Sequence, residues 1–485
     1  MIDTKTIRAK VLDLAIQGKL TEQRVEDGSG EELYNRIRIE ERLSSTKKNE
    51  KVLADIDDSE ILIGIPKNWT WCRLRRICTT DITYGIIKLG DEEPDGIRVL
   101  RCSDVKENYI NIDNIRTVIP ELSQEYSRTI LNGGEIVINV RGTLGGCALV
   151  PYEMKGYNVA REVAVIRQNS YVDGQFLVFV LLSPLFERFM KKMLRGVAYV
   201  GLNIAQLSTF PVPLPPLAEQ KRIAEAVGNI FSVLDSIDEY QKQYLNNNDI
   251  LKEKLLEASI QGKLTEQLPE DGTAEELYLQ IQAEKQELVK AKKIKREQPL
   301  PPIETKDIPF PIPANWKWVR LGDIARKIAS GSTPTGGRNS DVYVRSGYCL
   351  FREQNIYNDG IHEEGMVYIT EELLATRENS TVYAGDILLN ITGGSIGRCA
   401  VVPDTFDRGS VNQHILIIRM IDERLRHYIH KVICSPYAQK YINQKAFGDK
   451  GGFSGTRCKM MPIPLPPLEE QKRIVERIDG IYASI

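Results

Sequence analysis

Apolar side chains recur along the middle of the chain at intervals that alternate between four and three residues. The series covers 36 residues, and two polar residues occupy places in it: Ile223, Val227, Ile230, Leu234, Ile237, Gln241, Tyr244, Asn248, Leu251, Leu255 and Ala258. This is the heptad spacing of a helix that packs lengthwise against another helix. Such a helix can begin after Pro215-Pro216 and end at Gly262. At 1.5 Å per residue it would be more than about 50 Å long.

The two ends of the chain carry fragments of the same pattern. Ile7, Val11 and Leu14 correspond to the last three positions of the central series at an offset of 244 residues. The C-terminal end supplies counterparts of the first four apolar positions at an offset of 251, namely Ile474, Ile478, Ile481 and Ile485. An apolar stripe of this length needs a partner, because an exposed one would drive association. We therefore expect both end helices to lie antiparallel along the central helix as a coiled coil.

Two sequence blocks occur twice and identify the chain as a tandem repeat. Ile-Gln-Gly-Lys-Leu-Thr-Glu-Gln occupies Ile16–Gln23 and Ile260–Gln267, and Pro-x-Pro-Leu-Pro-Pro-Leu-x-Glu-Gln-Lys-Arg-Ile occupies Pro211–Ile223 and Pro462–Ile474. The first block lies near the N-terminus and mid-chain, whereas the second lies mid-chain and near the C-terminus. The repeat is therefore circularly permuted and has internal pseudo-twofold symmetry.

Between the duplicated blocks lie two variable domains of low mutual identity whose patterns still align. Gly134–Asn139 falls on Gly385–Asn390 at an offset of 251 residues. The expected organisation has five parts: an N-terminal half scaffold at 1–65, a first variable domain at 66–210, a central scaffold of helix and linker at 211–312, a second variable domain at 313–461, and a C-terminal half scaffold at 462–485.

The variable domains are expected to have an α+β fold. Ile136–Val140 and Ile387–Ile391 are uniformly apolar, as in buried strands, and each precedes a glycine turn and a second short strand. This order predicts a hairpin in each domain. Helices are expected to begin near Phe176 and Leu425 and to continue through the Ser-Pro pairs that follow them.

The segments that enter the variable domains also have a recognisable pattern. The four tryptophans occur as two Trp-x-Trp pairs, Trp69 with Trp71 and Trp316 with Trp318. Their alternation predicts strands packed at the edge of the core rather than surfaces for stacking on bases. Glu31 and Glu275 each begin a short charged helix. The basic run Lys290–Arg296 is interpreted as a solvated face rather than a DNA contact.

Composition restricts the class of protein. The chain has 485 residues, of which 42% are hydrophobic, and eight cysteines without a Cys-x-x-Cys pair. These features indicate a globular protein with reduced thiols. No long apolar run or signal peptide is apparent, so we expect a cytoplasmic protein without a membrane partner. Residues 66–210 contain 18 basic and 15 acidic residues, and residues 313–461 contain 19 and 15. The net charges of +3 and +4 suit binding to phosphates by these domains.

The sequence contains no recognisable catalytic constellation. It lacks a phosphate-binding glycine loop, an Asn/Asp-Pro-Pro-Tyr/Phe methyltransferase motif and a convincing nuclease cluster. His427 and His430 have helical spacing, but no carboxylate or cysteine cluster accompanies them, which favours a surface pair over a metal site. We expect no catalytic residue, no metal site and no cofactor in this chain.

The order of half scaffold, variable domain, full scaffold, variable domain and half scaffold, together with the two duplicated blocks, resembles the specificity subunits of type I restriction-modification systems. The resemblance implies two target-recognition domains, each reading half of a split asymmetric site in double-stranded DNA. It also implies two modification (methyltransferase) subunits that use S-adenosylmethionine, and restriction subunits that translocate and cleave DNA with ATP and Mg²⁺. The C-terminal copy ends at Ile485, before the counterpart of Asp235–Tyr244.

Candidate DNA contacts are basic or polar residues beside the glycine turns, in the loops before the second scaffold block, and at one shared arginine position: Arg101, Arg141, Thr143, Asn203, Arg352, Thr392, Ser395, Arg398 and Ser454. Arg101 and Arg352 coincide in the alignment, which favours a phosphate contact over base discrimination. Candidate docking residues are those of the identical scaffold copies, which could bind two identical partners: Glu219, Gln220, Lys221, Arg222, Glu470, Gln471, Lys472 and Arg473. A dimer-like DNA-binding regulator and a protein scaffold without DNA affinity remain alternatives.

Overall fold

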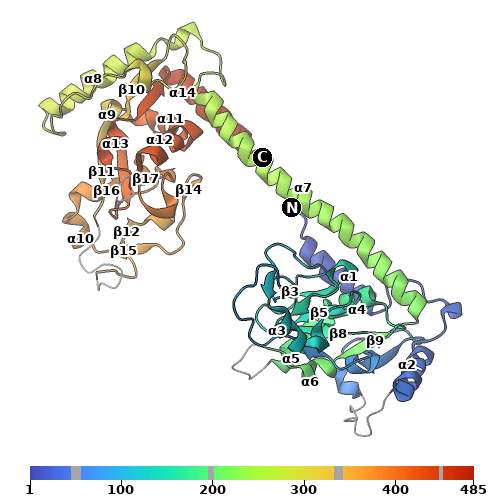
Figure 1. Cartoon of the computed structure of the whole chain (residues 1–485). Coiled ribbons are helices and arrows are strands. Elements are labelled where there is room, and N and C mark those ends of the chain that lie inside the picture. The colour runs from blue at the N-terminus through green and yellow to red at the C-terminus, as the bar shows by residue number, and fades with distance from the viewer. Residues whose placement is uncertain (45–55, 195–200, 333–341, 447–451) are drawn as a thin grey trace. The chain divides into compact units, whose positions relative to one another are not determined.

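The computed structural model describes residues 1–44, 56–194, 201–332, 342–446 and 452–485. The chain divides into two compact units, Met1–Lys242 and Gln243–Ile485. Helix α7 (Leu217–Ile260) begins in the first unit and ends in the second (Figure 1).

In the first unit, α1 (Thr4–Ile16) packs antiparallel to the N-terminal part of α7. Thr4 Oγ1 donates to Asp238 Oδ1 at 2.5 Å, and one helical turn later Arg8 Nη2 donates to Asp235 Oδ1 at 2.8 Å. Residue numbers rise along α1 as they fall along α7, so the predicted antiparallel pairing is confirmed.

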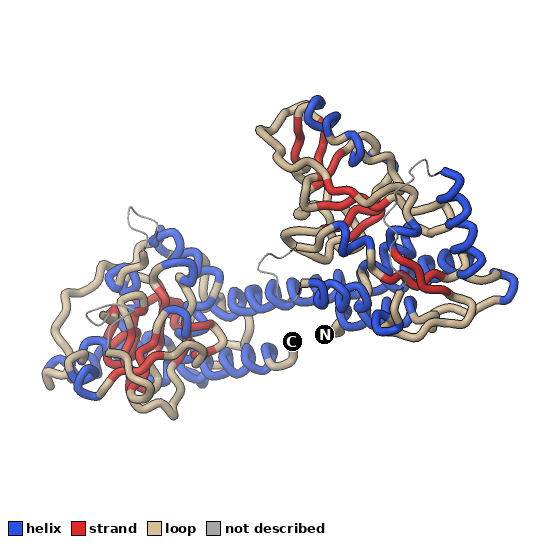
Figure 2. The backbone as a smooth tube through the Cα atoms, turned by 90° about the horizontal axis from the view of Figure 1, so that it is seen from below, coloured by secondary structure: helices blue, strands red, loops and turns tan. Residues whose placement is uncertain are grey.

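The second unit repeats this pairing with α14 (Leu468–Tyr482), which lies beside the C-terminal part of α7 (Figures 1 and 2). Tyr482 Oη donates to the Lys252 carbonyl at 3.4 Å, and Asn248 Nδ2 donates to the Ile485 carbonyl at 3.2 Å. Each end of the chain therefore completes the helix pair of its own unit.

The predicted seam is wrong at several positions. Tyr244 and Leu251 are 54% and 40% exposed, whereas Phe231 and Leu256, which lie outside the heptad series, are buried. The two buried residues belong to the hydrophobic clusters of the globular parts, on which α7 packs as well as on an end helix. Phe231, for example, makes an edge-on contact with Phe179 at 5.6 Å between ring centroids.

Glycine ends both copies of the scaffold helix. Gly18 and Gly262 have φ of +66° and +69°, and an added Cβ would lie 2.3 Å from Pro66 Cγ or Pro313 Cγ. The Lys263 N–H donates to the Ala258 carbonyl at 2.9 Å, which closes the end of α7 in the manner of a Schellman motif. The predicted stop at Gly262 is confirmed.

The second tryptophan of each Trp-x-Trp pair lies in a strand, as predicted, whereas the first is buried directly before that strand. Each strand pairs with a proline-rich block. The first unit joins β1 (Thr70–Arg73) antiparallel to β9 (Pro211–Leu214), and the second joins β10 (Lys317–Arg320) to β21 (Pro462–Leu465). Proline is compatible with these ladders because each has only two strands, so N–H groups can be missing on the open side.

The hairpin predicted from the apolar runs lies at one edge of the four-stranded sheet of the first unit. Strands β5 and β6 are antiparallel neighbours, which confirms that hairpin. The four-stranded sheet has the order β2 (Thr83–Tyr84), β8 (Val163–Ile166), β5 (Ile136–Asn139) and β6 (Cys147–Leu149). The three-stranded sheet has the order β4 (Arg116–Val118), β3 (Ile97–Leu100) and β7 (Asn158–Val159).

The second unit has the same hairpin in a sheet whose edge strand is longer. Its first sheet has the order β11 (Ala325–Ser330), β20 (Ile415–Met420), β17 (Ile387–Asn390) and β18 (Cys399–Val401). Its second has the order β15 (Val367–Ile369), β12 (Tyr348–Phe351), β19 (Arg408–Val411) and β16 (Thr381–Tyr383). A small hairpin pairs β13 (Ile356–Tyr357) with β14 (Gly360–Ile361).

Further helices complete each unit. In the first unit they are α2 (Gly30–Ser44), α3 (Pro120–Glu125), α4 (Gly174–Leu181), α5 (Pro184–Met193) and α6 (Ile204–Ser208). In the second unit they are α8 (Ala274–Lys290), α9 (Leu321–Ile324), α10 (Glu371–Ala375), α11 (Arg426–Cys434), α12 (Pro436–Ala446) and α13 (Gly455–Lys459).

The helices do not run through the Ser-Pro pairs, contrary to the prediction. Ser183 and Ser435 have ψ of 159° and 152°, and new helices, α5 and α12, begin at the prolines that follow. A residue before proline is sterically disfavoured in the helical region, whereas proline itself suits the first turn of a helix.

Candidate nucleic-acid interface

Arg141 lies in the glycine turn between β5 and β6 of the first unit. Its guanidinium carbon is 5.9 Å from the centre of the Tyr84 ring, and Tyr84, on edge strand β2, is 45% exposed. Gly201 pairs with Arg141 in an isolated bridge, and a Cβ there would lie 3.1 Å from Arg141 Cγ. Arg141 makes no ion pair with any residue that the structure describes. A stacked guanidinium without a carboxylate keeps its donor edge available for an anion or a base.

Arg398 occupies a similar environment at the other end of the glycine turn in the second unit. Its guanidinium carbon is 4.4 Å from the centre of the Tyr357 ring, and His362 stacks on Tyr357 with 4.1 Å between ring centroids. Within the described ranges Arg398 has no ion pair. The sequence alignment places Arg398 opposite Gly146 and Arg141 opposite Thr392. The two turns thus present an arginine from opposite ends of a shared framework.

The other predicted residues of the turns divide into exposed and internally bonded ones. Thr143 is exposed. Thr392 Oγ1 lies 2.7 Å from His414 Nδ1, and Ser395 Oγ accepts a hydrogen bond from Asn390 Nδ2 at 3.2 Å. These contacts orient the turn of the second unit.

Asn203 and Ser454 are aligned N-terminal caps. The Asn203 side chain accepts from the Gln206 N–H at 2.8 Å, and the Ser454 hydroxyl accepts from the Arg457 N–H at 3.3 Å. Both residues are exposed. Their correspondence in the repeat is explained by capping, whether or not they also reach DNA.

Arg101 and Arg352 hold equivalent loops together. Arg101 Nη2 donates to the Asn114 carbonyl at 3.1 Å, and Arg352 Nη2 donates to the Gly365 carbonyl, thirteen residues further along in both cases. Arg101 also pairs with Asp104 at 3.2 Å. Each arginine closes the same loop in its own unit, and this role is sufficient to explain why the two residues align.

Four of the eight predicted docking residues are buried within the chain, so that interpretation is wrong for them. Glu219, Gln220 and Glu470 are fully buried and Gln471 is 2% exposed. Gln220 Nε2 donates to the Pro215 carbonyl at 3.0 Å, and Gln471 Nε2 donates to the Pro466 carbonyl at 2.9 Å. A partner protein cannot reach these side chains in this fold.

Each buried glutamate accepts hydrogen bonds from a tryptophan and from the duplicated octapeptide. Glu219 accepts from Trp69 Nε1 at 2.9 Å and from Gln23 Nε2 at 2.9 Å. Glu470 repeats the arrangement in the second unit, with Trp316 Nε1 and Gln267 Nε2 both at 2.8 Å and Thr265 Oγ1 at 3.1 Å. The two duplicated blocks are therefore contact partners within each unit.

The remaining predicted docking residues are two arginines in ion pairs and two exposed lysines. Arg222 Nη2 lies 2.5 Å from Asp27 Oδ2, and Arg473 Nη2 lies 2.5 Å from Asp271 Oδ2. The hydrogen bond from the guanidinium holds the pKa of Asp27 and Asp271 below the usual range of aspartate. Lys221 and Lys472 are exposed, so partner docking stays a prediction for these two.

Replacing Arg473 by Met is expected to destabilise the chain by roughly 1–2 kcal/mol at neutral pH. Asp271 has a lowered pKa in the folded state, so its contribution is fully present above the unfolded pKa of about 3.9 and is lost as pH falls through the folded pKa. Urea unfolding from pH 7 downward should show the parent and variant converging below about pH 4. Lys472→Met, at the exposed neighbour, serves as the control. A constant difference at every pH would contradict this assignment.

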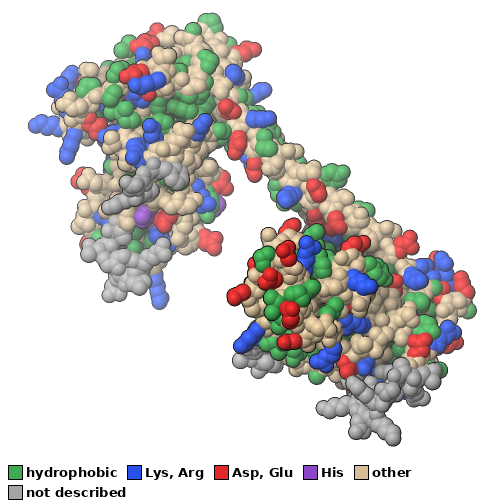
Figure 3. Space-filling model, in the orientation of Figure 1, with side chains coloured by type: hydrophobic (Ala, Val, Ile, Leu, Met, Phe, Trp, Pro, Cys, Tyr) green, Lys and Arg blue, Asp and Glu red, His purple; other side chains and the backbone are tan. Residues whose placement is uncertain are grey.

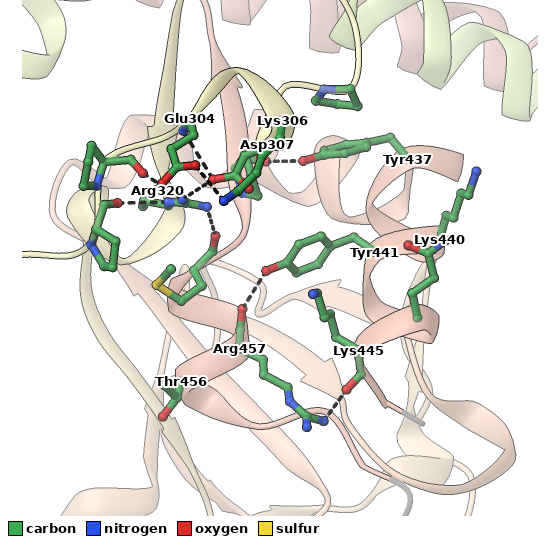
Figure 4. Close-up of a pocket in the computed structure, with 16 residues that line it drawn as sticks. Glu304, Lys306, Asp307, Arg320, Tyr437, Lys440, Tyr441, Lys445, Thr456 and Arg457 are labelled. Atoms are coloured by element: carbon green, nitrogen blue, oxygen red, sulfur yellow. Dashed lines mark hydrogen bonds and ion pairs between the residues drawn. The ribbon is translucent and has the colours of Figure 1, made fainter. Parts of the chain in front are cut away.

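A buried arginine missed by the sequence reasoning fastens each linker to its domain. Arg320 Nη2 lies 2.7 Å from Asp307 Oδ2, and Arg320 Nη1 donates to the Met460 carbonyl at 2.8 Å. Arg73 makes the corresponding contacts with Glu60 at 2.7 Å and the Thr209 carbonyl at 2.8 Å. The Arg320 cluster forms one wall of a cavity of about 820 Å³, opposite Tyr437, Tyr441 and Lys445 (Figure 4).

The predicted surface pair on α11 is correct for His427, which is exposed, and wrong for His430, which is buried. His430 is 9% exposed, and its Nε2 lies 2.9 Å from the Cys399 carbonyl and 3.5 Å from Cys434 Sγ. Within the described ranges, no group of three or more His, Cys, Asp or Glu residues is arranged to hold a metal ion. No described helix is long and apolar enough to cross a membrane.

Comparison with known proteins gives one consistent picture. A family model described as the type I restriction modification DNA specificity domain matches residues 66–250 and 313–485. The specificity subunits of the type I restriction enzymes EcoAI and EcoEI from Escherichia coli are 25% and 24% identical to the chain, and each alignment covers 99% of this chain and 89% of the relative. A solved chain from a study of type I R-M system assembly has the same fold, with a TM-score of 0.57, 19% identity, and coverage of 86% of this chain and 91% of that one.

Proposed function

The chain belongs to the family of type I restriction-modification DNA specificity subunits, and from this premise we propose that its two variable domains, 66–210 and 313–461, each read one half of a bipartite asymmetric DNA site. The protein is a DNA-recognition component and not an enzyme, because catalysis in these systems belongs to other subunits. The scaffold that carries the two domains would set the distance between the half-sites.

The observation that carries this proposal is a pair of arginines, one in each domain, that lie over a tyrosine ring and have no ion pair among the described residues. Arg141 over Tyr84 and Arg398 over Tyr357 present guanidinium groups from opposite ends of the same turn framework. An arginine fork can bind O6 and N7 of guanine in the major groove, and each such contact discriminates against other bases. Because the two domains present this arginine from different positions in the turn, they would read different half-sites. Thr143, Thr392 and Ser395 would add contacts from the same turns.

The partners of this component are modification and restriction subunits. Two modification subunits would bind the repeated scaffold, one at each copy, and methylate adenine with S-adenosylmethionine. The restriction subunits would use ATP and Mg²⁺, so these cofactors act outside this chain. The exposed residues Lys221 and Lys472 are the candidate docking side chains at equivalent places. We place the assembly in the cytoplasm, where the DNA that it reads is accessible.

Sequencing N6-methyladenine across the genome with and without this gene tests the proposal. In cells that supply the modification subunits, a single bipartite asymmetric motif should be methylated only when the gene is present. A strain with the modification subunits alone is the control for other methyltransferases. An unchanged set of methylated motifs, in cells that make the assembled complex, would favour a regulator or a protein scaffold instead.

A further inference from the structure

A basic groove lies on the second unit beside the C-terminal end of α8. It has a volume of about 1090 Å³ and is bordered by the residues after α8, by β11 and by the turn between β16 and β17. Lys and Arg side chains gather around this end of α8 in the space-filling view (Figure 3). Six of the lining side chains are lysines or arginines from the segment after α8 and from β11: Lys292, Lys293, Lys295, Arg296, Arg326 and Lys327.

The positive charge of this groove is only partly neutralised. Two further cations that line it have carboxylate partners, since Arg419 pairs with Asp386 at 2.6 Å and Lys459 pairs with Glu297 at 2.6 Å. None of the six cations named above forms an ion pair within the described ranges of the chain. Two other glutamates line the groove, Glu378 and Glu423, so the lining has a clear excess of positive charge.

Contacts on both sides fix the segment that carries the lysines. Lys285 Nζ donates to the Gly322 carbonyl at 2.7 Å and Gln282 Nε2 donates to the Asp323 carbonyl at 3.0 Å, which fastens α8 to α9. After the lysines, Glu297 is held by Lys459. The groove is therefore formed by packed elements. The lysines of the basic run are exposed, as a solvated run requires, and the segment that carries them is held to the second unit on both sides.

Lys292 occupies a backbone position that normally favours glycine. Its φ is +54°, and the Lys293 N–H donates to the Leu288 carbonyl at 2.9 Å, as the residue after Gly262 does at the end of α7. A side chain with a Cβ is disfavoured in this conformation. Glycine occupies the corresponding position at the ends of α1 and α7, so a lysine with this backbone conformation points to a use for its ammonium group.

We propose that this groove binds the phosphate backbone of the duplex whose bases domain 313–461 reads. The inference rests on the proposed function, which supplies DNA as the ligand. Several cations without an ion pair among the described residues suit successive phosphates and carry no base information. Charged side chains often protect an open sheet edge from pairing with another strand, which would explain Arg326 and Lys327 on edge strand β11. This role does not explain the lysines after α8. Burial lowers the pKa of Lys327, which a bound phosphate would offset.

The test is a salt titration of duplex binding by the chain assembled with its modification subunits. The variant combines Lys292→Gly, Lys293→Gln and Lys295→Gln, all at exposed positions. At about 0.15 M salt its affinity should fall about tenfold, and the slope of log K against log salt should decrease by about 2. The loss should be equal for the cognate duplex and for one with a scrambled site. Lys290→Gln, an exposed lysine of α8 that pairs with Glu287 at 2.5 Å, should bind like the parent.

Lys292→Gly alone separates a binding role from a structural one. It should preserve or raise the unfolding temperature, because glycine suits the backbone, while weakening duplex binding about twofold to threefold. Parent-like binding by the triple variant at every salt concentration would overturn the proposal, and so would a loss confined to the cognate duplex. Loss of modification-subunit assembly with no change in duplex binding would also overturn it, assigning the groove to a protein. Failure of the parent assembly to prefer its cognate duplex would instead reject the proposed function.

Discussion

Glu470→Ala is expected to lower the free energy of unfolding by about 3 kcal/mol, because it leaves several buried donors without an acceptor. The carboxylate is fully buried and accepts from Trp316 Nε1 and Gln267 Nε2 at 2.8 Å and from Thr265 Oγ1 at 3.1 Å. Urea unfolding followed by tryptophan fluorescence and circular dichroism measures the change, and Trp316 itself reports on the site.

Three further variants make this test specific. Glu219→Ala should cause a similar loss, since Glu219 accepts from Trp69 and Gln23 in the same way. Glu470→Gln should lower the free energy of unfolding by about half as much. An amide keeps one acceptor oxygen, but its NH2 group would face donors that now bind the second carboxylate oxygen. Lys472→Ala changes an exposed residue of the same helix and should be nearly neutral. Parent-like stability of Glu470→Ala would mean that the buried donors find other partners.

This contact explains why the duplicated blocks are alike while the domains between them are not. The octapeptide supplies Gln23 or Gln267, and the proline-rich block supplies Glu219 or Glu470. A change on either side leaves a buried polar group unpaired, so both sides are constrained together. The glycine turns carry no such mutual constraint and can differ in the position of their arginine.

Repetition and periodicity were sufficient to predict the frame of the fold from the sequence. The heptad series and its offset fragments gave the antiparallel pairing of α1 and α14 with α7, and uniformly apolar runs gave the β5–β6 and β17–β18 hairpins. These features depend on local spacing. Glu219 and Glu470 were misinterpreted because a charged residue in a polar run is usually exposed, and only the tertiary structure brings tryptophan to it.

The candidate site was less accessible to sequence reasoning. Arg141 and Arg398 were chosen because they flank glycine turns, but Tyr84 and Tyr357, which stack on them, lie 57 and 41 residues earlier in the chain. No spacing rule connects such pairs, because the order of the strands in the sheets determines which residues meet. For Arg101 and Arg352, a repeated loop closure is sufficient to explain the alignment, so the alignment alone does not identify a phosphate contact.

Arg398→Ala is expected to reduce the preference of the assembled complex for its cognate duplex by about tenfold or more, because one bidentate base contact contributes roughly 1–3 kcal/mol of discrimination. The guanidinium lies 4.4 Å from the Tyr357 ring and has no ion pair within the described residues, so no internal contact of comparable strength is lost with it. Binding to the cognate duplex and to duplexes with single base changes in each half-site measures the effect.

The pattern of loss distinguishes base reading from a backbone contact. Arg398→Ala should relax the sequence requirement in one half-site only, and Arg141→Ala should relax it in the other, since the two arginines belong to different domains. Arg398→Lys should restore charge but little discrimination, because an ammonium cannot form the planar fork. Tyr357→Phe should bind like the parent, since the ring that supports the guanidinium remains. An equal loss on every duplex would assign Arg398 to the phosphate backbone, and unchanged binding would remove it from the interface.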